Sequence, residues 1–309
     1  MAQMLIMGKR NLKINFPKNF SYNFLKSFMS ESKNLKKILK DNLDQKIWDW
    51  FSEKLSSIIK NESSKDFFLM YSICSIKIKS KAINFDLNKN KSLNYLKIQK
   101  TNLLELSRIY LLLKVLKEKN SFFLDKVKKL IQIADKEEIE TFLKYLIFLP
   151  NPKDFHFHAV DALRTNISSV FDAIAINNPY PYLYFTNEQW NQMYLKAAFM
   201  ERKIENILYV EKKANEDLAR IISDYAHERW AASRDIDPQI WQPTSQFLNE
   251  KLLKDMNILF KSKNPLENKA AALCCYHSKN EIAKKELDKY PELKNLILSK
   301  KLTWENFKN

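Results

Sequence analysis

Apolar residues recur along most of the chain at the three- and four-residue spacing of an amphipathic helix. In 44–60, Ile47, Trp48, Phe51, Leu55 and Ile58 fall on one stripe. The segment 77–98 is rich in polar residues and irregular in pattern, so we expect a loop or partly ordered linker there. The same periodicity predicts further helices at about 64–76, 100–118, 121–133, 135–149, 157–176, 187–200, 216–233, 265–277, 279–288 and 291–299. The pattern therefore predicts an all-α fold.

Helix boundaries are marked by capping residues and prolines. Thr186 followed by Gln189 predicts a capping box, and Asn215 is a candidate N-cap. Asp237-Pro238 and Asn264-Pro265 place proline at its preferred first helical position. The breaker at 150–152 suggests a Lys-rich N-terminal helical region, 1–150, and a C-terminal helical domain, 153–309. Successive short helices suggest antiparallel pairs in an array like that of HEAT repeats.

Glycine is almost absent from this chain of 309 residues, with a single Gly at position 8. Phosphate-binding loops, dinucleotide-binding turns and nucleophile elbows all need glycine for tight or left-handed backbone. The composition therefore argues against P-loop NTPases, dinucleotide-binding folds and α/β-hydrolases.

The net charge of +16 comes almost wholly from lysine, with 45 Lys against 7 Arg. A solvated basic surface and an anion-binding surface are both open, but base reading usually needs arginine, so nucleic acid is not the expected partner. The three cysteines form no CxxC pair, which indicates a reducing compartment. No run approaches the length of a transmembrane helix. We therefore expect a cytoplasmic protein with no membrane span.

Short blocks between residues 161 and 248 resemble the EboA-domain family. The blocks are ALRTN (162–166), VFDAIAINNPYP (170–181), WNQMYLKAAF (190–199), DYAHERWAA (224–232) and IDPQIW (236–241). The resemblance implies an all-helical bacterial protein of secondary-metabolite production or precursor export, without assigned catalytic residues or cofactors. It also implies partners encoded in the same ebo cluster, among them a membrane prenyltransferase-like protein, and hence a peripheral place at the inner membrane.

The predicted helix 157–176 carries a stripe of short polar side chains. Asp161, Thr165, Ser168 and Asp172 are spaced to lie on one face, with Arg164 at its edge. A packed, hydrogen-bonded seam between helices is one interpretation, and a ligand groove is the other.

The predicted helix 216–233 holds the most chemically suggestive residues. Arg229 falls among apolar positions, which predicts a carboxylate partner from Asp161, Asp172 or Glu228, or alternatively a bound anion. His227 beside Asp224 has the composition of an oriented general base. If the protein is an enzyme, the candidate catalytic residues are Asp224, His227, Glu228 and Arg229.

Metal binding is not expected, because HERWA lacks the second histidine of HExxH. A composite site of His156, His158, His227 and Asp224 is a weaker alternative.

The segment 177–182 reads either as a helix stop with a rigid turn or as a recognition loop. Asn191 is expected to be a buried amide that holds this loop. The expected binding surface consists of Asp161, Arg164, Thr165, Asp172, Asn177, Asn178, Tyr180, Asn191 and Trp230.

The function we expect is a non-catalytic scaffold or binding component of a secondary-metabolite pathway. Two alternatives remain: a helical enzyme acting on a small hydrophobic or isoprenoid-like precursor, and a basic HEAT-like protein that binds nucleic acid.

Overall fold

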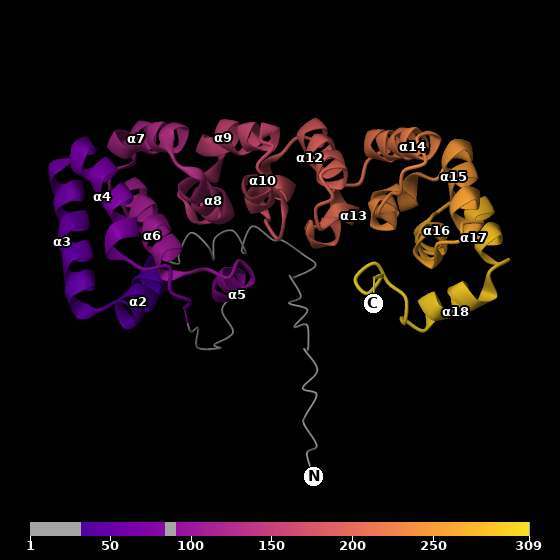
Figure 1. Ribbon diagram of the computed structural model, residues 1–309, viewed down its shortest axis with the longest axis horizontal. Helices are drawn as coiled ribbons and strands as arrows, with labels where there is room; N and C mark the ends of the chain where they lie inside the picture. The colour runs from indigo at the N-terminus through magenta and orange to yellow at the C-terminus, as the bar shows by residue number, and fades with distance from the viewer. Residues whose placement is uncertain (1–31, 84–90, 309) are drawn as a thin grey trace, which may run out of the picture. The chain divides into compact units, whose positions relative to one another are not determined.

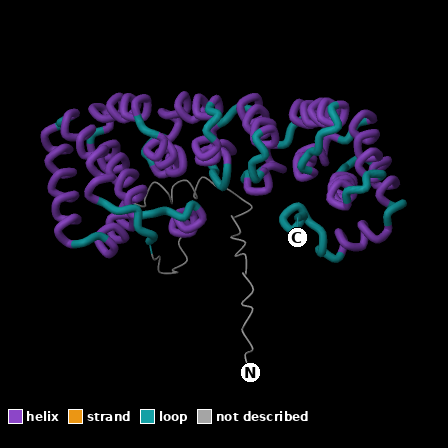
Figure 2. Tube along the Cα trace, in the orientation of Figure 1, coloured by secondary structure: helices purple, strands orange, loops and turns teal. Residues whose placement is uncertain are grey.

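The computed structural model describes residues 32–83 and 91–308, which form helices joined by short connections (Figures 1 and 2). Apart from one isolated antiparallel bridge between Ala82 and Asn102, these residues contain no strand, which confirms the all-α prediction. None of their helices has the length and apolar character that a bilayer crossing requires. The described residues divide into two compact units, one within 32–127 together with 148–150 and the other within 128–147 and 151–308.

The first unit is organised around α6 (Leu103–Glu118), which is buried on nearly all sides. A helix that is apolar all round belongs in the centre of a core. Around it pack α2 (Ser32–Asn42), α3 (Gln45–Asn61) and α4 (Ser64–Lys77). The prediction of an irregular segment at 77–98 is wrong in part, because α5 spans Lys91–Ile98 and buries Tyr95 and Leu96.

The second unit contains α8 and the helices that follow it, with α7 (Asn120–Ile133) leading into it. The expected boundary lay after residue 150, but α8 packs against α10 and so belongs here. The two-domain assignment and the solenoid arrangement stay predictions. The boundary at 147–148 falls within η1 (Leu146–Phe148). The other elements of the second unit are α8 (Lys136–Tyr145), η2 (Pro152–Phe155), α9 (His156–Asp161), η3 (Ala162–Arg164), α10 (Ser168–Ala175), α11 (Tyr180–Tyr184), α12 (Asn187–Phe199), η4 (Ile204–Asn206), α13 (Val210–Lys213), α14 (Glu216–Ala231), η5 (Pro238–Phe247), α15 (Glu250–Phe260), α16 (Pro265–His277), α17 (Glu281–Leu287) and α18 (Pro291–Leu298).

The expected long helix at 157–176 is wrong, because the chain breaks between Arg164 and Ser168. Thr165 adopts an extended backbone, with φ −63° and ψ 146°. Its Oγ1 accepts a hydrogen bond of 3.1 Å from the Ile167 N–H, a local bond that competes with helical pairing. The residues expected to form one polar stripe therefore lie on two separate helices and the turn between them.

Several predicted helix starts are confirmed at the level of individual hydrogen bonds. Thr186 and Gln189 form a complete capping box at α12. The side chains of Asn215 and Asn264 cap α14 and α16. Asp237 caps η5, which continues as a 3-10 helix through Pro243. In the orange and yellow part of Figure 1, α14 to α17 follow one another, and η5 packs against both α14 and α16.

Candidate functional site

The start of α14 is held in place by a pair of side-chain amides. Asn215 caps the helix through a 2.9 Å bond from the Leu218 N–H. The amides of Asn191 and Asn215 bond each other reciprocally, at 3.0 and 2.9 Å. Asn191 is buried, as expected, but the expectation that it holds the 177–182 segment is wrong. It positions the first turn of α14 instead.

A groove lies between α14 and the start of α15, and we call it the α14–α15 groove. It has a cavity volume of about 310 Å³. Its rim carries acidic and basic side chains, and Phe247 and Leu252 make part of its wall apolar. The lining residues are Glu216, Asp217, Ala219, Arg220, Ser223, Asp224, Phe247, Asn249, Lys251 and Leu252.

Asp224 is the centre of a small ion-pair cluster on this rim. Its carboxylate accepts a 2.6 Å bond from Lys251 Nζ of α15 and lies 3.5 Å from the Arg220 guanidinium on its own helix. Arg220 and Asp224 are four residues apart and so lie one turn from each other on the same face of α14. The hydrogen bond from Lys251 lowers the pKa of the Asp224 carboxyl. Because all three side chains are more than half exposed, the pairs stabilise the fold only weakly and remain open to solvent.

Beneath the groove lies a buried carboxylate that sequence reasoning missed. Asp255 of α15 is 1% exposed. Ser223 Oγ donates a 2.6 Å bond to its Oδ2, and His227 Nε2 lies 2.7 Å from its Oδ1. His227 is therefore oriented by Asp255 and not by Asp224. The available signal was the apolar stripe Leu252, Met256 and Leu259, on which Asp255 stands as the one charged group.

Trp230 connects this network to the core of the second unit. Its ring stacks on the buried Trp241 ring at 6.0 Å and 23°, and meets the His227 ring edge-on at 5.3 Å. The structure thus brings His227 and Trp230 together, as expected for residues on one helix, and adds Asp255 from α15 and Trp241 from η5.

Arg229 does not have the carboxylate partner that was expected, so that prediction is wrong. Its Nε and Nη2 donate bonds of 3.1 and 2.6 Å to the backbone carbonyl of Asp235. The side chain is half-exposed and closes the turn after α14. Glu228 is exposed on the same helix. Since a backbone acceptor satisfies the guanidinium, no ion pair is needed there.

The residues expected on the polar stripe instead form separate local contacts. Asp161 and Arg164 form an exposed pair at 3.4 Å. Asp172 receives a bidentate pair from Arg202, with N–O distances of 2.9 and 2.6 Å. The carbonyl of Thr165 accepts a 2.8 Å bond from Lys196 Nζ. The Arg202 and Lys196 contacts tie α10 and the turn before it to α12 and the segment after it, whereas the Asp161–Arg164 pair is local to the surface. The packed-seam and ligand-groove interpretations stay predictions.

The 177–182 segment is a rigid turn with a buried interior. Asn178 is 3% exposed and donates to the carbonyls of Leu143 and Ala173 at 3.0 and 2.8 Å. Tyr180 is fully buried, and its hydroxyl donates to the Pro152 carbonyl at 3.1 Å. Burial raises the pKa of the Tyr180 phenol. A ligand arriving from solvent would therefore not touch these two side chains.

Asn177 occupies the left-handed backbone region, with φ 52°, and its N–H donates to the Asn206 carbonyl at 2.8 Å. Asparagine tolerates this conformation better than most residues. It therefore makes the turn without glycine.

The histidines do not gather into a metal site in the described part of the chain, where no three His, Cys, Asp or Glu side chains converge. His156 packs edge-on against Phe185, and His158 lies beside Phe155 and Phe157. Burial lowers the pKa of His158. The composite site of His156, His158, His227 and Asp224 is therefore not formed among these residues.

Comparison with known proteins gives one result. Residues 31–245 match the family model described as "Metabolite traffic protein EboA", which is more than half of the 309 residues. No curated protein and no solved structure matches the chain. The matched range contains α14 with its cap and the Trp230–Trp241 contact, whereas α15 lies beyond it. The family resemblance seen in the sequence is thereby confirmed, and the chain belongs to the EboA family.

Proposed function

We propose that this protein is a non-catalytic binding component of metabolite traffic, and that the α14–α15 groove is where it holds a small polar molecule. The observation that carries the proposal is the family match, whose description names metabolite traffic and whose range includes α14. The groove volume of about 310 Å³ suits a small metabolite. The acidic and basic side chains at the rim favour a ligand that carries both a positive and a negative group.

Three of the candidate catalytic side chains, Asp224, His227 and Arg229, each have a different partner, which favours a binding role over catalysis. Asp224 pairs with Lys251, His227 with Asp255, and Arg229 with a backbone carbonyl. In an active site, the general base and the groups that stabilise developing charge must all reach the same bound substrate. These three side chains are directed to three separate contacts instead.

The proposed partners are other proteins encoded in the ebo cluster, including the membrane prenyltransferase-like protein, and the proposed location is the cytoplasmic side of the inner membrane. A scaffold of this kind would pass a precursor between them. Nucleic acid is not a proposed partner.

Metabolite extraction tests the groove directly. Tagged protein is purified from its native host, denatured, and the released small molecules are identified by mass spectrometry. Lys251→Ala removes a lining side chain, and Lys254→Ala is the matched control, because Lys254 is an exposed lysine on the same helix that pairs with Glu250. We expect a molecule that is retained by wild type and Lys254→Ala and depleted in Lys251→Ala. Equal recovery from all three proteins, or recovery of none, would overturn the proposal.

A pull-down from cytosolic and detergent-solubilised membrane fractions tests the scaffold role. Recovery of the ebo-cluster proteins with wild type, and their loss with Glu228→Arg on the exposed face of α14, would support it. Recovery of abundant contaminants alone would contradict it.

One observation favours the enzyme alternative: the short contact that orients His227 on the buried Asp255. Such an imidazole has the geometry of a general base. Conversion of a host metabolite by wild type, lost in His227→Gln, would establish catalysis and contradict the non-catalytic proposal.

A further inference from the structure

A second, smaller cavity, which shares no lining residue with the α14–α15 groove, lies where α13, η5, the end of α16 and the C-terminal turn meet. We call it the Trp304 cavity. Its volume is about 70 Å³. At about 10–15 Å³ per water position, this is room for some five waters, or for the head group of a small molecule. Its lining residues are Glu211, Ala214, Gln242, Pro243, Ser245, Gln246, His277 and Trp304.

The indole wall of this cavity is firmly anchored. Trp304 is 4% exposed, and its carbonyl accepts a 3.4 Å bond from Gln239 Nε2. Beyond it, Lys308 Nζ reaches Asp237 at 2.6 Å and Glu205 at 3.2 Å. Burial alone would lower the pKa of Lys308, but these carboxylates raise it, so the ammonium stays charged. The C-terminal turn is thereby clamped to η4 and η5.

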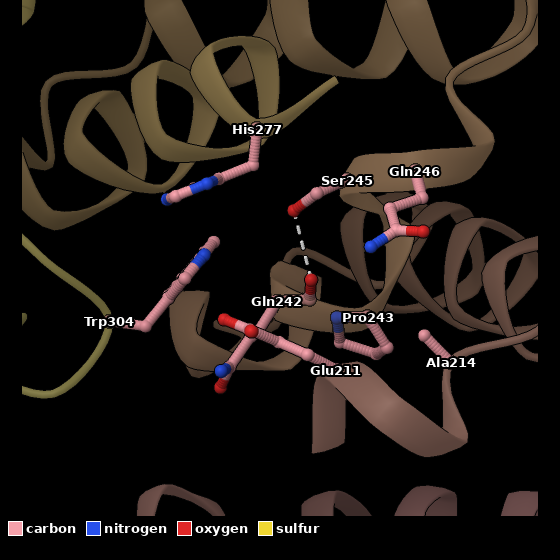
Figure 3. A pocket seen from close by; sticks show the side chains of 8 residues that line it. All are labelled: Glu211, Ala214, Gln242, Pro243, Ser245, Gln246, His277 and Trp304. Atoms are coloured by element: carbon pink, nitrogen blue, oxygen red, sulfur yellow. Dashed lines mark hydrogen bonds between the residues drawn. The ribbon is translucent and has the colours of Figure 1, made fainter. Parts of the chain in front are cut away.

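The opposite wall is equally constrained. η5 is a 3-10 helix with Pro243 inside it, and Ser245 Oγ donates a 2.9 Å bond to the Gln242 carbonyl. That bond is the dashed line in Figure 3. A rigid wall of this kind holds a binding site without paying for its ordering at the moment of binding.

The chemistry of the open side points to a cation. Figure 3 shows the Glu211 and Gln242 side chains extending towards Trp304, with the His277 imidazole above the indole. Glu211 is exposed at the mouth of the cavity, and its carboxylate forms no ion pair within the described residues. The cavity therefore joins a free carboxylate, an aromatic ring and acceptor atoms of amide and imidazole groups.

We infer that the Trp304 cavity binds the protonated primary amino group of a small molecule. The ammonium donates to the Glu211 carboxylate and to the second lone pair of the Gln242 amide oxygen, whose first accepts a 3.2 Å bond from Gln239 Nε2. The Trp304 ring attracts the charge through the cation–π interaction. The short cavity accommodates the amino group and its first carbons, while the rest of the molecule extends into solvent past the exposed Gln246 and His277. This site is separate from the groove of the proposed function.

Fluorine NMR of protein labelled with 5-fluorotryptophan tests the inference at a single residue. The chain has 6 tryptophans, and Trp304→Phe assigns the resonance of interest. Propylammonium chloride is the probe, 1-propanol is its neutral counterpart of the same size, and propionate is the anionic one. We expect a saturable shift of the Trp304 resonance with propylammonium alone. A shift of equal size with 1-propanol, or no shift with propylammonium, would overturn the inference.

Glu211→Gln keeps the shape of the side chain and removes its charge. We expect propylammonium to bind it about tenfold more weakly than wild type, the effect of losing one charge-assisted contact. Glu292→Gln is the matched control, since Glu292 is exposed on α18 and does not line the cavity. Equal affinity of Glu211→Gln and Glu292→Gln would contradict the role of the carboxylate. Lys251→Ala should leave propylammonium binding unchanged. A failure of this inference can therefore be told apart from a failure of the proposal for the α14–α15 groove.

Discussion

The buried Asp255 makes His227 a stabilising residue whose contribution depends on charge. Asp255 is 1% exposed, and among the described residues its carboxylate is bonded by His227 and Ser223, so His227→Ala leaves it with the Ser223 hydroxyl alone. Breaking a fully buried ion pair costs about 3–5 kcal/mol. The His227 side chain is 48% exposed, so water can replace part of the imidazole's contribution. We therefore expect His227→Ala to lower the free energy of unfolding by about 2 kcal/mol.

A double-mutant cycle separates this charge effect from simple loss of packing. Asp255→Asn keeps a hydrogen-bonding side chain but removes the buried charge. In that background, His227→Ala should cost less than about 1 kcal/mol, because no uncompensated anion is left behind. Urea unfolding followed by far-ultraviolet circular dichroism gives the four free energies, provided that the urea dependence of the unfolding free energy is the same in all four proteins.

Two outcomes would refute the reasoning behind this cycle. One is an equal cost of His227→Ala in both backgrounds, which would assign the effect to packing against Trp230. The other is a cost no larger than that of His277→Ala, an exposed histidine for which we expect a change within about 0.5 kcal/mol.

Three further predictions concern the scaffold of the second unit. Arg202→Ala should lower the free energy of unfolding by about 1–2 kcal/mol, because it removes a bidentate, partly buried pair with Asp172; a thermal unfolding curve identical to wild type would contradict this. Asn191→Ala should speed amide hydrogen exchange in the first turn of α14 and not in its last, since it removes the side chain that holds the Asn215 cap; uniform exchange along α14 would argue against that role. Burial raises the pKa of Cys274 to about 12 and that of Cys275 further, so at about pH 8 neither should react with an aromatic disulfide reagent until urea unfolds the chain. Prompt reaction of the folded protein would show that these thiols are accessible.

Sequence patterns were most informative where the interactions are local. The Thr186–Gln189 capping box and the Asn215 and Asn264 caps were all predictable, because each depends on residues within three positions of one another. They were less informative at 157–176, where apolar spacing continues through a break made by the Thr165 side chain. Periodicity reports which face is apolar and does not register a local hydrogen bond that interrupts the helix.

The candidate site was predicted only in its residues and not in its contacts. Asp224, His227 and Trp230 were identified on one helix, yet His227 is oriented by Asp255, 28 residues away, and Arg229 by a backbone carbonyl. Tyr180 was expected at a surface and lies in the core.

By itself, the sequence determined that this protein is helical, where most of its helices begin, and to which family it belongs. These properties follow from composition, short-range capping and blocks of adjacent residues. The tertiary structure alone decided which carboxylate meets which histidine, and which side chains enclose the α14–α15 groove and the Trp304 cavity. The physical reason is that burial and charge pairing depend on segments distant in the chain, as where the C-terminal turn brings Trp304 against η5.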